Sequence, residues 1–158
     1  VRRVIVTRAF KDLPFPPGPE VVVVERDNLP YRLGELEILG PPPWEKFGRP
    51  AAANETSVVV RTDGLLLPGD IEERGVEELL GLPDLRARVL VLPHHGKHHR
   101  LHAELVRRVD PEMILVSGPE GYASPEVLQA LPRPPRLTGR EGAIEIELLP
   151  DVVRPWRR

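Results

Sequence analysis

All five histidines of the chain lie in one short segment, His94, His95, His98, His99 and His102. This segment directly follows the apolar run Arg88 to Leu92 and a proline. Imidazoles on a loop at the end of a strand can approach a metal ion or a phosphate, and Gly96 lets the backbone turn closely beside them. The alternative is a solvated, weakly basic loop in which the histidines are incidental.

Asp70 is the second residue whose position suggests chemistry. It follows the apolar run Leu65 to Leu67 in a Gly-Asp step that precedes a predicted helix. As a ligand, its carboxylate and an imidazole at the end of a neighbouring strand would form a mixed oxygen and nitrogen site for a divalent metal. The alternative is a helix cap, in which the carboxylate accepts hydrogen bonds from the first N–H groups of the helix. If the metal hypothesis is right, Asp70 and the His94-His95 pair must lie close together.

The elements that must position these side chains are short apolar runs bounded by Gly, Pro and Asp, a pattern typical of strands. The Asp63-Gly64 pair predicts a tight hairpin between two of them. The order of strands and then alternating helices and strands predicts one α/β domain over residues 1 to 158. Strands are predicted over Arg3 to Thr7, Val21 to Glu25, Glu35 to Leu39, Ser57 to Thr62, Leu65 to Pro68, Arg88 to Leu92, Glu112 to Ser117 and Ala143 to Leu148, and helices over Glu72 to Leu80, Leu101 to Val109 and Pro125 to Leu131.

Composition narrows the class of protein. The formal charge of −2 gives no global field for nucleic acid or membrane, and the absence of cysteine excludes thiolate zinc sites and a cysteine nucleophile. No apolar run approaches the roughly 20 residues of a membrane-spanning helix. The 20 prolines, the preference for Arg over Lys and the scarcity of thermolabile side chains favour a thermophilic source, although a GC-rich genome produces much of the same bias. Because the chain begins with Val1, we expect it to be a piece of a longer protein.

Four motifs in order carry a resemblance to a known family. They are Asn54-Glu55-Thr56-Ser57-Val58-Val59-Val60, then Leu65-Leu66-Leu67-Pro68-Gly69-Asp70-Ile71-Glu72, then Val89-Leu90-Val91-Leu92-Pro93-His94-His95-Gly96, and finally Gly142-Ala143-Ile144. Together they resemble the C-terminal metallo-β-lactamase-like domain of the ComEC competence proteins. The resemblance extends from Glu35 to Leu148, and no match is found upstream of it.

The resemblance implies an αββα sandwich, or only its C-terminal portion, that binds Zn or Mn and hydrolyses phosphodiesters of DNA during uptake. Asp70 would be the shared metal ligand. One of His94 and His95 would be a further ligand, with His95 favoured, and the other would contact the scissile phosphate. The chain would be a soluble domain of a membrane protein, with the membrane channel of the same parent protein as its partner.

Three departures from the family pattern bear on activity. A His-x-Asp-x-Asp-His element, the family's first metal motif, is absent, and no histidine precedes His94. Lys97 replaces the serine that follows His-His-Gly, and Ser124 stands in the substrate loop where the family has a histidine. Two explanations are open: the ligands lie upstream of this chain, or the domain is degenerate, holds no metal, and binds DNA or plays a structural role.

A basic stretch provides a second class of function. Lys97, Arg100, Arg107 and Arg108 stand against Glu104 alone, and they can contact the backbone of single-stranded DNA without any chemistry. The alternative interpretation is that these residues form a solvated face of a helix and bind no DNA. Similarly, Trp44 and Phe47 in the irregular loop from Gly40 to Asn54 can stack on a base or anchor the loop to the core, and Gly118 to Gly121 is interpreted as a turn.

Overall fold

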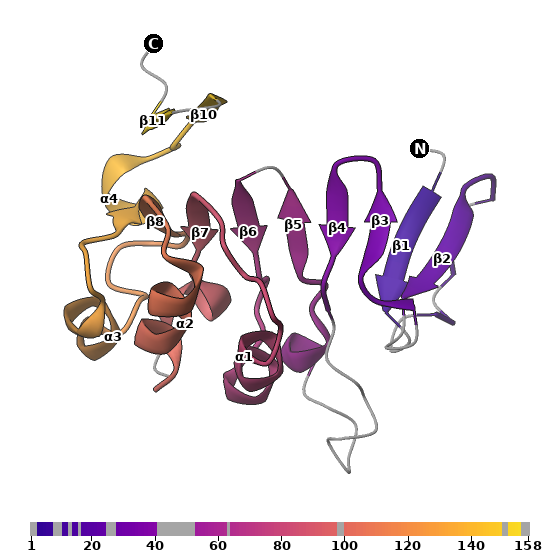
Figure 1. The fold of residues 1–158 in the computed structure, drawn as a ribbon, viewed down its shortest axis with the longest axis horizontal. Helices are drawn as coiled ribbons and strands as arrows, with labels where there is room; N and C mark the ends of the chain where they lie inside the picture. The colour runs from indigo at the N-terminus through magenta and orange to yellow at the C-terminus, as the bar shows by residue number, and fades with distance from the viewer. Residues whose placement is uncertain are drawn as a thin grey trace.

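A computed structural model describes residues 3–7, 11–12, 14–15, 17–24, 28–40, 53–62, 64–97, 100–149 and 152–155. Trp44, Phe47, His98 and His99 lie outside the described residues. The architecture is mixed α/β, as predicted, with a sheet of seven strands and helices packed against it (Figure 1).

The seven-stranded sheet has the order β3-β4-β5-β6-β7-β8-β9. Its first four strands are antiparallel neighbours, and from β6 to β9 the neighbours are parallel. Its strands are β3 (Tyr31–Leu33), β4 (Leu36–Ile38), β5 (Val60–Thr62), β6 (Leu65–Leu67), β7 (Val89–Val91), β8 (Met113–Val116) and β9 (Arg136–Leu137).

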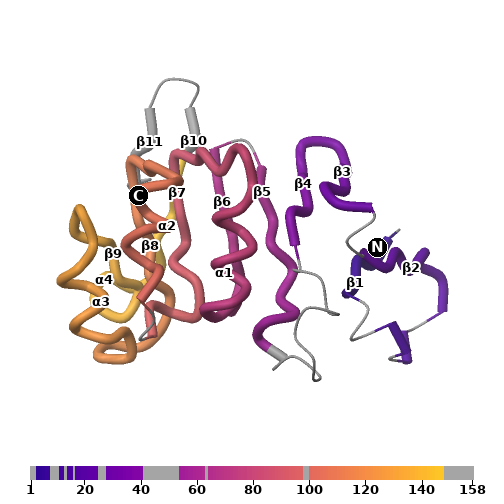
Figure 2. The backbone as a smooth tube through the Cα atoms, turned by 60° about the horizontal axis from the view of Figure 1, so that its bottom comes forward, coloured from indigo at the N-terminus to yellow at the C-terminus, as the bar shows by residue number. Residues whose placement is uncertain are grey.

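Among the described residues, α-helices and 3₁₀ turns accompany the sheet. The helices are α1 (Glu73–Leu80), α2 (His102–Val109), α3 (Pro125–Ala130) and α4 (Thr138–Glu141), and the 3₁₀ turns are Ala53–Thr56 and Pro93–Gly96. The first three helices agree with the sequence prediction to within one residue at either end. α1 and α2 lie side by side (Figure 2).

Two further pairs of strands lie toward opposite ends of the sheet (Figure 1). β1 (Arg3–Thr7) pairs in parallel with β2 (Glu20–Val24), and β10 (Ile146–Leu149) pairs antiparallel with β11 (Val152–Pro155). The predicted strand over Ala143 to Leu148 is therefore partly right, because the structure begins it at Ile146 and pairs it outside the main sheet.

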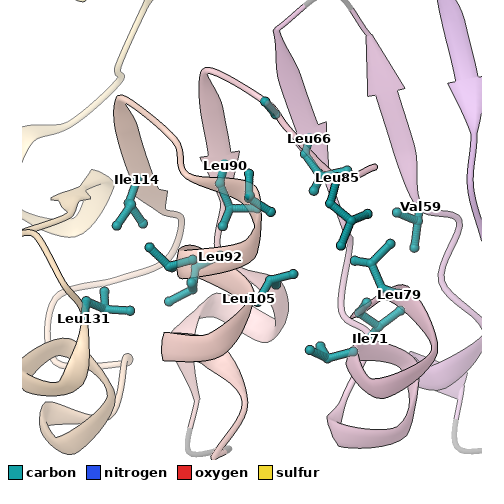
Figure 3. Close-up of a cluster of buried hydrophobic side chains, with 14 of the residues drawn as sticks. Val59, Leu66, Ile71, Leu79, Leu85, Leu90, Leu92, Leu105, Ile114 and Leu131 are labelled. Atoms are coloured by element: carbon teal, nitrogen blue, oxygen red, sulfur yellow. The ribbon is translucent and has the colours of Figure 1, made fainter. Parts of the chain in front are cut away.

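The core lies between the sheet and the helices. Leu66, Leu90 and Ile114 are cross-strand neighbours that point toward Leu79 of α1 and Leu105 of α2 (Figure 3). All of them are 4% exposed or less. Because successive side chains of a strand alternate between faces, the opposite face of the same strands carries Leu65, Leu67, Val89, Val91, Met113 and Leu115. The central strands are thus apolar on both faces, which is typical of a sheet that forms an inner layer.

The predicted hairpin at Asp63-Gly64 is confirmed by the antiparallel pairing of Thr62 with Leu65, and Gly64 has the positive φ of +77° that such a turn requires. The prediction that a strand begins at Ser57 is wrong. Ala53–Thr56 forms a 3₁₀ turn, and β5 begins only at Val60. The Ser57 N–H donates to the carbonyl of Asn54 at 3.0 Å, which closes that turn.

No helix among the described residues has both the length and the apolar character needed to cross a membrane.

Candidate functional site at the strand ends

The candidate site forms where two parallel strands end. β6 and β7 pair in parallel, with Leu65 opposite Val89. Gly69 and Asp70 follow the end of β6, and His94 and His95 follow the end of β7. Because parallel strands end at the same edge of a sheet, the two segments meet there, and the N–H of His94 donates to the carbonyl of Gly69 at 3.2 Å.

Of the two histidine–carboxylate pairs in this site, Asp70 and His95 form the closer one. The Nε2 of His95 lies 3.5 Å from Oδ1 of Asp70, and both side chains are partly exposed. The expectation that Asp70 reaches the histidine pair is therefore confirmed. On its other side, the His95 ring places Nδ1 2.9 Å from the backbone carbonyl of Ser117 and 3.1 Å from its Oγ.

These contacts assign the protons of the imidazole. The carbonyl of Ser117 can only accept, so Nδ1 of His95 carries the hydrogen. In the neutral ring, Nε2 then presents its lone pair to the Asp70 carboxylate. A proton on Nε2 or a cation bound by both groups would make this contact favourable.

The separation fits a cation. Two ligands of one tetrahedral ion, each about 2.0 to 2.2 Å from it, lie roughly 3.3 to 3.5 Å apart. The observed 3.5 Å between Nε2 of His95 and Oδ1 of Asp70 matches this spacing. Across the described parts of the chain, however, no group of three or more His, Asp or Glu side chains could hold an ion, so the two residues fit as part of a ligand set.

His94 belongs to a second pair. Its Nδ1 lies 3.7 Å from Oε1 of Glu72, and the same oxygen accepts a hydrogen bond from the side-chain amide of Asn54 at 3.0 Å. The two adjacent histidines therefore face two different carboxylates, and the structure places His94 and His95 in different surroundings.

The histidine pair lies on a left-handed turn. His94 has φ of 48° and ψ of 40°, His95 has φ of 55° and ψ of 24°, and Gly96 continues the turn with φ of 69°. Left-handed backbone costs an L-residue about 1 to 2 kcal/mol. Such conformations concentrate where a site requires a particular side-chain direction. Here the turn aims one imidazole at Glu72 and the next at Asp70.

The alternative role of Asp70 as the cap of α1 is wrong. The N–H groups of Glu72, Arg74 and Gly75 donate instead to the carboxylate of Glu55, at 3.2, 3.3 and 2.8 Å. Glu55 is only 7% exposed. Since the cap comes from another segment, the Asp70 side chain remains available to His95.

An aromatic ring borders the site. Tyr122 is 42% exposed and meets the His95 ring edge to face, with 5.5 Å between the ring centroids. Lys97 Nζ lies 4.4 Å from the centroid of Tyr122. The N–H of Ser124 donates to the carbonyl of Gly96 at 3.0 Å, and the predicted turn before Tyr122 is confirmed by its N–H bonding to the carbonyl of Pro119.

The predicted DNA-binding residues do not form one free basic surface. Arg100 pairs with Glu73 and Glu77 of α1, and Arg108 donates to the carbonyls of Leu82 and Pro83. Arg107 is exposed and has no such partner among the described residues.

His102 differs from the other described histidines, because it is 1% exposed and its Nε2 lies 2.8 Å from the carbonyl of Lys97.

A cavity of about 530 Å³ lies away from this site, between β4, β5 and the end of α1, where it is lined by Leu39, Leu79 and the Glu37–Arg61 pair. Arg61 Nε donates to Oε2 of Glu37 at 2.8 Å. Burial alone would raise the pKa of Glu37, but the hydrogen bonds from Arg61 and Arg32 lower it below its ordinary value.

Comparison with known proteins adds one relative. The chain is 32% identical over 93 residues to ComE operon protein 3 of Bacillus subtilis (strain 168). The chain is therefore related to a competence protein. The aligned segment covers 53% of this chain and only 12% of that protein. No family model matches the chain, and no solved structure matches it.

Sequence reasoning assigned no role to several residues of the site: Ser117, Glu72, Glu55, Ser57 and Asn54. A signal existed for Ser117, because it directly follows β8, the next parallel strand, and the ends of parallel strands meet at one edge. The hydrogen bonds of Glu55 gave no such signal, since the groups it accepts from lie 17 to 20 residues away.

Proposed function

We propose that this chain is a domain of a DNA-uptake protein, and that Asp70 and His95 belong to a site that hydrolyses the phosphodiester backbone with a divalent metal ion. The observation that carries the proposal is the 3.5 Å contact between Nε2 of His95 and Oδ1 of Asp70. The relation to a competence protein supports the substrate class.

In this proposal the residues of the chain have distinct tasks. Asp70 and His95 would hold Zn or Mn, which supplies charge neutralisation at the phosphate and a water of lowered pKa. Ser117 keeps the proton on Nδ1 of His95, so that Nε2 stays available as a ligand. The remaining ligands would come from outside the described residues, so we expect the isolated chain to cleave DNA weakly or not at all.

The fold that goes with this function is a metallo-β-lactamase-like αββα sandwich, of which this chain would supply the C-terminal portion. Its support is the sheet with helices on one face and apolar side chains on both faces of its central strands. The channel part of the same parent protein would be its partner at the membrane.

A second candidate is a non-catalytic domain that binds the DNA backbone or has a structural role. One observation favours it: the described residues include no group of three or more ligands for an ion. In this function the His94 and His95 loop and the exposed Arg107 would contact phosphates without hydrolysis.

Calorimetric titration of the chain with Mn²⁺ separates the two candidates. The hydrolytic function predicts about one ion per chain, with an affinity that falls about tenfold or more in Asp70→Asn and in His95→Asn. Asp110→Asn is the matched control, because Asp110 is an exposed aspartate at the C-terminal end of α2 and its loss should leave the affinity unchanged. Absence of Mn²⁺ binding by the wild-type chain would overturn the hydrolytic function, and salt-dependent DNA binding would then support the second.

A further inference from the structure

The 3₁₀ turn Ala53–Thr56 and the following Ser57 contact both acidic residues of the strand-end site, Glu72 through its carboxylate and Asp70 through its backbone N–H. Glu55 fixes this segment in place. Its buried carboxylate accepts three backbone N–H groups at the start of α1, the shortest from Gly75 at 2.8 Å. A Cβ on Gly75 would lie 2.7 Å from Oε2 of Glu55, so only glycine at this position lets the carboxylate come so close.

Ser57 holds the backbone of Asp70. The N–H of Asp70 donates to Oγ of Ser57 at 3.2 Å. The preceding residue, Gly69, has φ of +65°, and a Cβ there would lie 2.9 Å from Cβ of Ser57. The Gly-Asp step therefore packs directly on Ser57, which sets the direction from which the Asp70 side chain approaches His95.

Asn54 holds the side chain of Glu72 instead. Its amide donates to Oε1 of Glu72 at 3.0 Å, and this is the oxygen that lies 3.7 Å from Nδ1 of His94. The donor fixes which carboxylate oxygen faces the ring. Asn54 thus contacts the carboxylate of Glu72, whereas Ser57 contacts the backbone N–H of Asp70, and the two carboxylates face different histidines.

We propose that Ser57 and Asn54 are positioning residues, each of which holds one carboxylate against its own histidine: Ser57 for the Asp70–His95 pair and Asn54 for the Glu72–His94 pair. This proposal rests on the proposed function only in taking the strand-end cluster as the functional site. One anchored turn therefore aligns two neighbouring pairs independently.

The test compares Ser57→Ala and Asn54→Ala in the full chain. The readout is the ring-nitrogen resonances of His94 and His95 in heteronuclear NMR without metal, with buried His102 as the internal reference. Ser57→Ala should shift the resonances of His95 and leave those of His94, and Asn54→Ala should do the reverse. The control is Asn28→Ala, which removes an amide that donates to the carbonyl of Val23 and should shift neither.

A merely structural role for the turn predicts a different result, since loosening it would disturb both pairs at once. If either variant shifts both histidines equally, or if neither variant shifts any, the proposal is overturned. Should an alanine variant fail to fold, Ser57→Cys weakens the one hydrogen bond and Asn54→Leu removes the other with little change in side-chain size, and both variants are judged by the same pattern.

Titration with Mn²⁺ separates this proposal from the proposed function. If the wild-type chain binds Mn²⁺, Ser57→Ala should weaken binding about tenfold, and the control Asn28→Ala should leave it unchanged. If the wild-type chain binds no Mn²⁺, the hydrolytic function fails, but the pattern of histidine shifts still decides whether Ser57 and Asn54 position the two pairs.

Discussion

The carboxylate of Glu55 accepts a hydrogen bond from the backbone N–H of Gly75 at 2.8 Å, across 20 residues of sequence. α1 has no side-chain cap of its own at Glu72. The unsatisfied N–H groups of its first turn are bonded by a residue from another segment, and Gly75 provides the space for it. The relationship links the stability of α1 to the turn that contacts the site.

Replacing Glu55 should therefore destabilise the whole fold. Glu55→Gln keeps the size of the side chain but puts an amide NH₂ against N–H donors, and we expect a loss of about 1 to 3 kcal/mol in the free energy of unfolding. Chemical denaturation measures it. Glu104→Gln, on the exposed side of α2, should change stability by less than about 0.5 kcal/mol; equal effects of the two substitutions would contradict the role of Glu55.

The left-handed turn predicts that the glycine variant is more stable than the alanine variant, the reverse of the order in a helix. At position 94, with φ of 48°, His94→Gly should be more stable than His94→Ala by about 1 to 2 kcal/mol. At Arg107 in α2, glycine should instead be less stable than alanine by about 1 kcal/mol. Thermal or denaturant unfolding of the four variants tests the difference. The same order at both positions would show that His94 is not held in a left-handed conformation.

The Glu37–Arg61 pair predicts a pH dependence of stability. The pKa of Glu37 in the folded state is below its ordinary value of 4.5. A depressed folded pKa contributes stability that is present above the unfolded value and is lost as the pH falls through the folded value. The stability difference between the wild type and Glu37→Gln should therefore shrink as the pH falls below about 4.5. A difference that is constant between neutral and acidic pH would exclude this contribution.

Two adjacent arginines should affect different properties. Arg108→Ala loses its bonds to the carbonyls of Leu82 and Pro83 and should cost about 1 kcal/mol of stability. Arg107→Ala should leave stability unchanged. If α2 contacts the DNA backbone, Arg107→Ala should also reduce the slope of log affinity against log salt by about 0.7 to 0.9. If the chain shows no measurable DNA binding at low salt, the basic stretch is only a solvated face of the helix and has no role in DNA binding.

The sequence predicted the elements with consecutive or helically spaced apolar residues well, because clear boundary residues flank them. The strands β6, β7 and β8 and the helices α1 and α2 are found where they were expected. β3 and β9 were missed. Tyr31–Leu33 and Arg136–Leu137 each contain an arginine and form no apolar run, so their pairing with a neighbouring strand decides their conformation.

The contact between Asp70 and the histidine pair was predicted, whereas the residues that surround this contact were not. The ends of neighbouring strands indicated that Asp70 and the histidines would meet. Which histidine faces Asp70 depends on the left-handed turn at His94 and His95, and the proton position on His95 depends on Ser117. Both follow from contacts between distant segments, which no local pattern encodes.

The change of strand direction at β6 also sets an order of folding. β5 and β6 form an antiparallel hairpin, in which Val60 pairs with Leu67 after the closure of a very short loop. β7 reaches β6 only through a crossover that contains α1, and such long closures are slow. We expect amides of the hairpin to gain protection first in pulse-labelled hydrogen exchange. In a chain arrested at that stage, His94 and His95 would not yet face the carboxylates of Glu72 and Asp70.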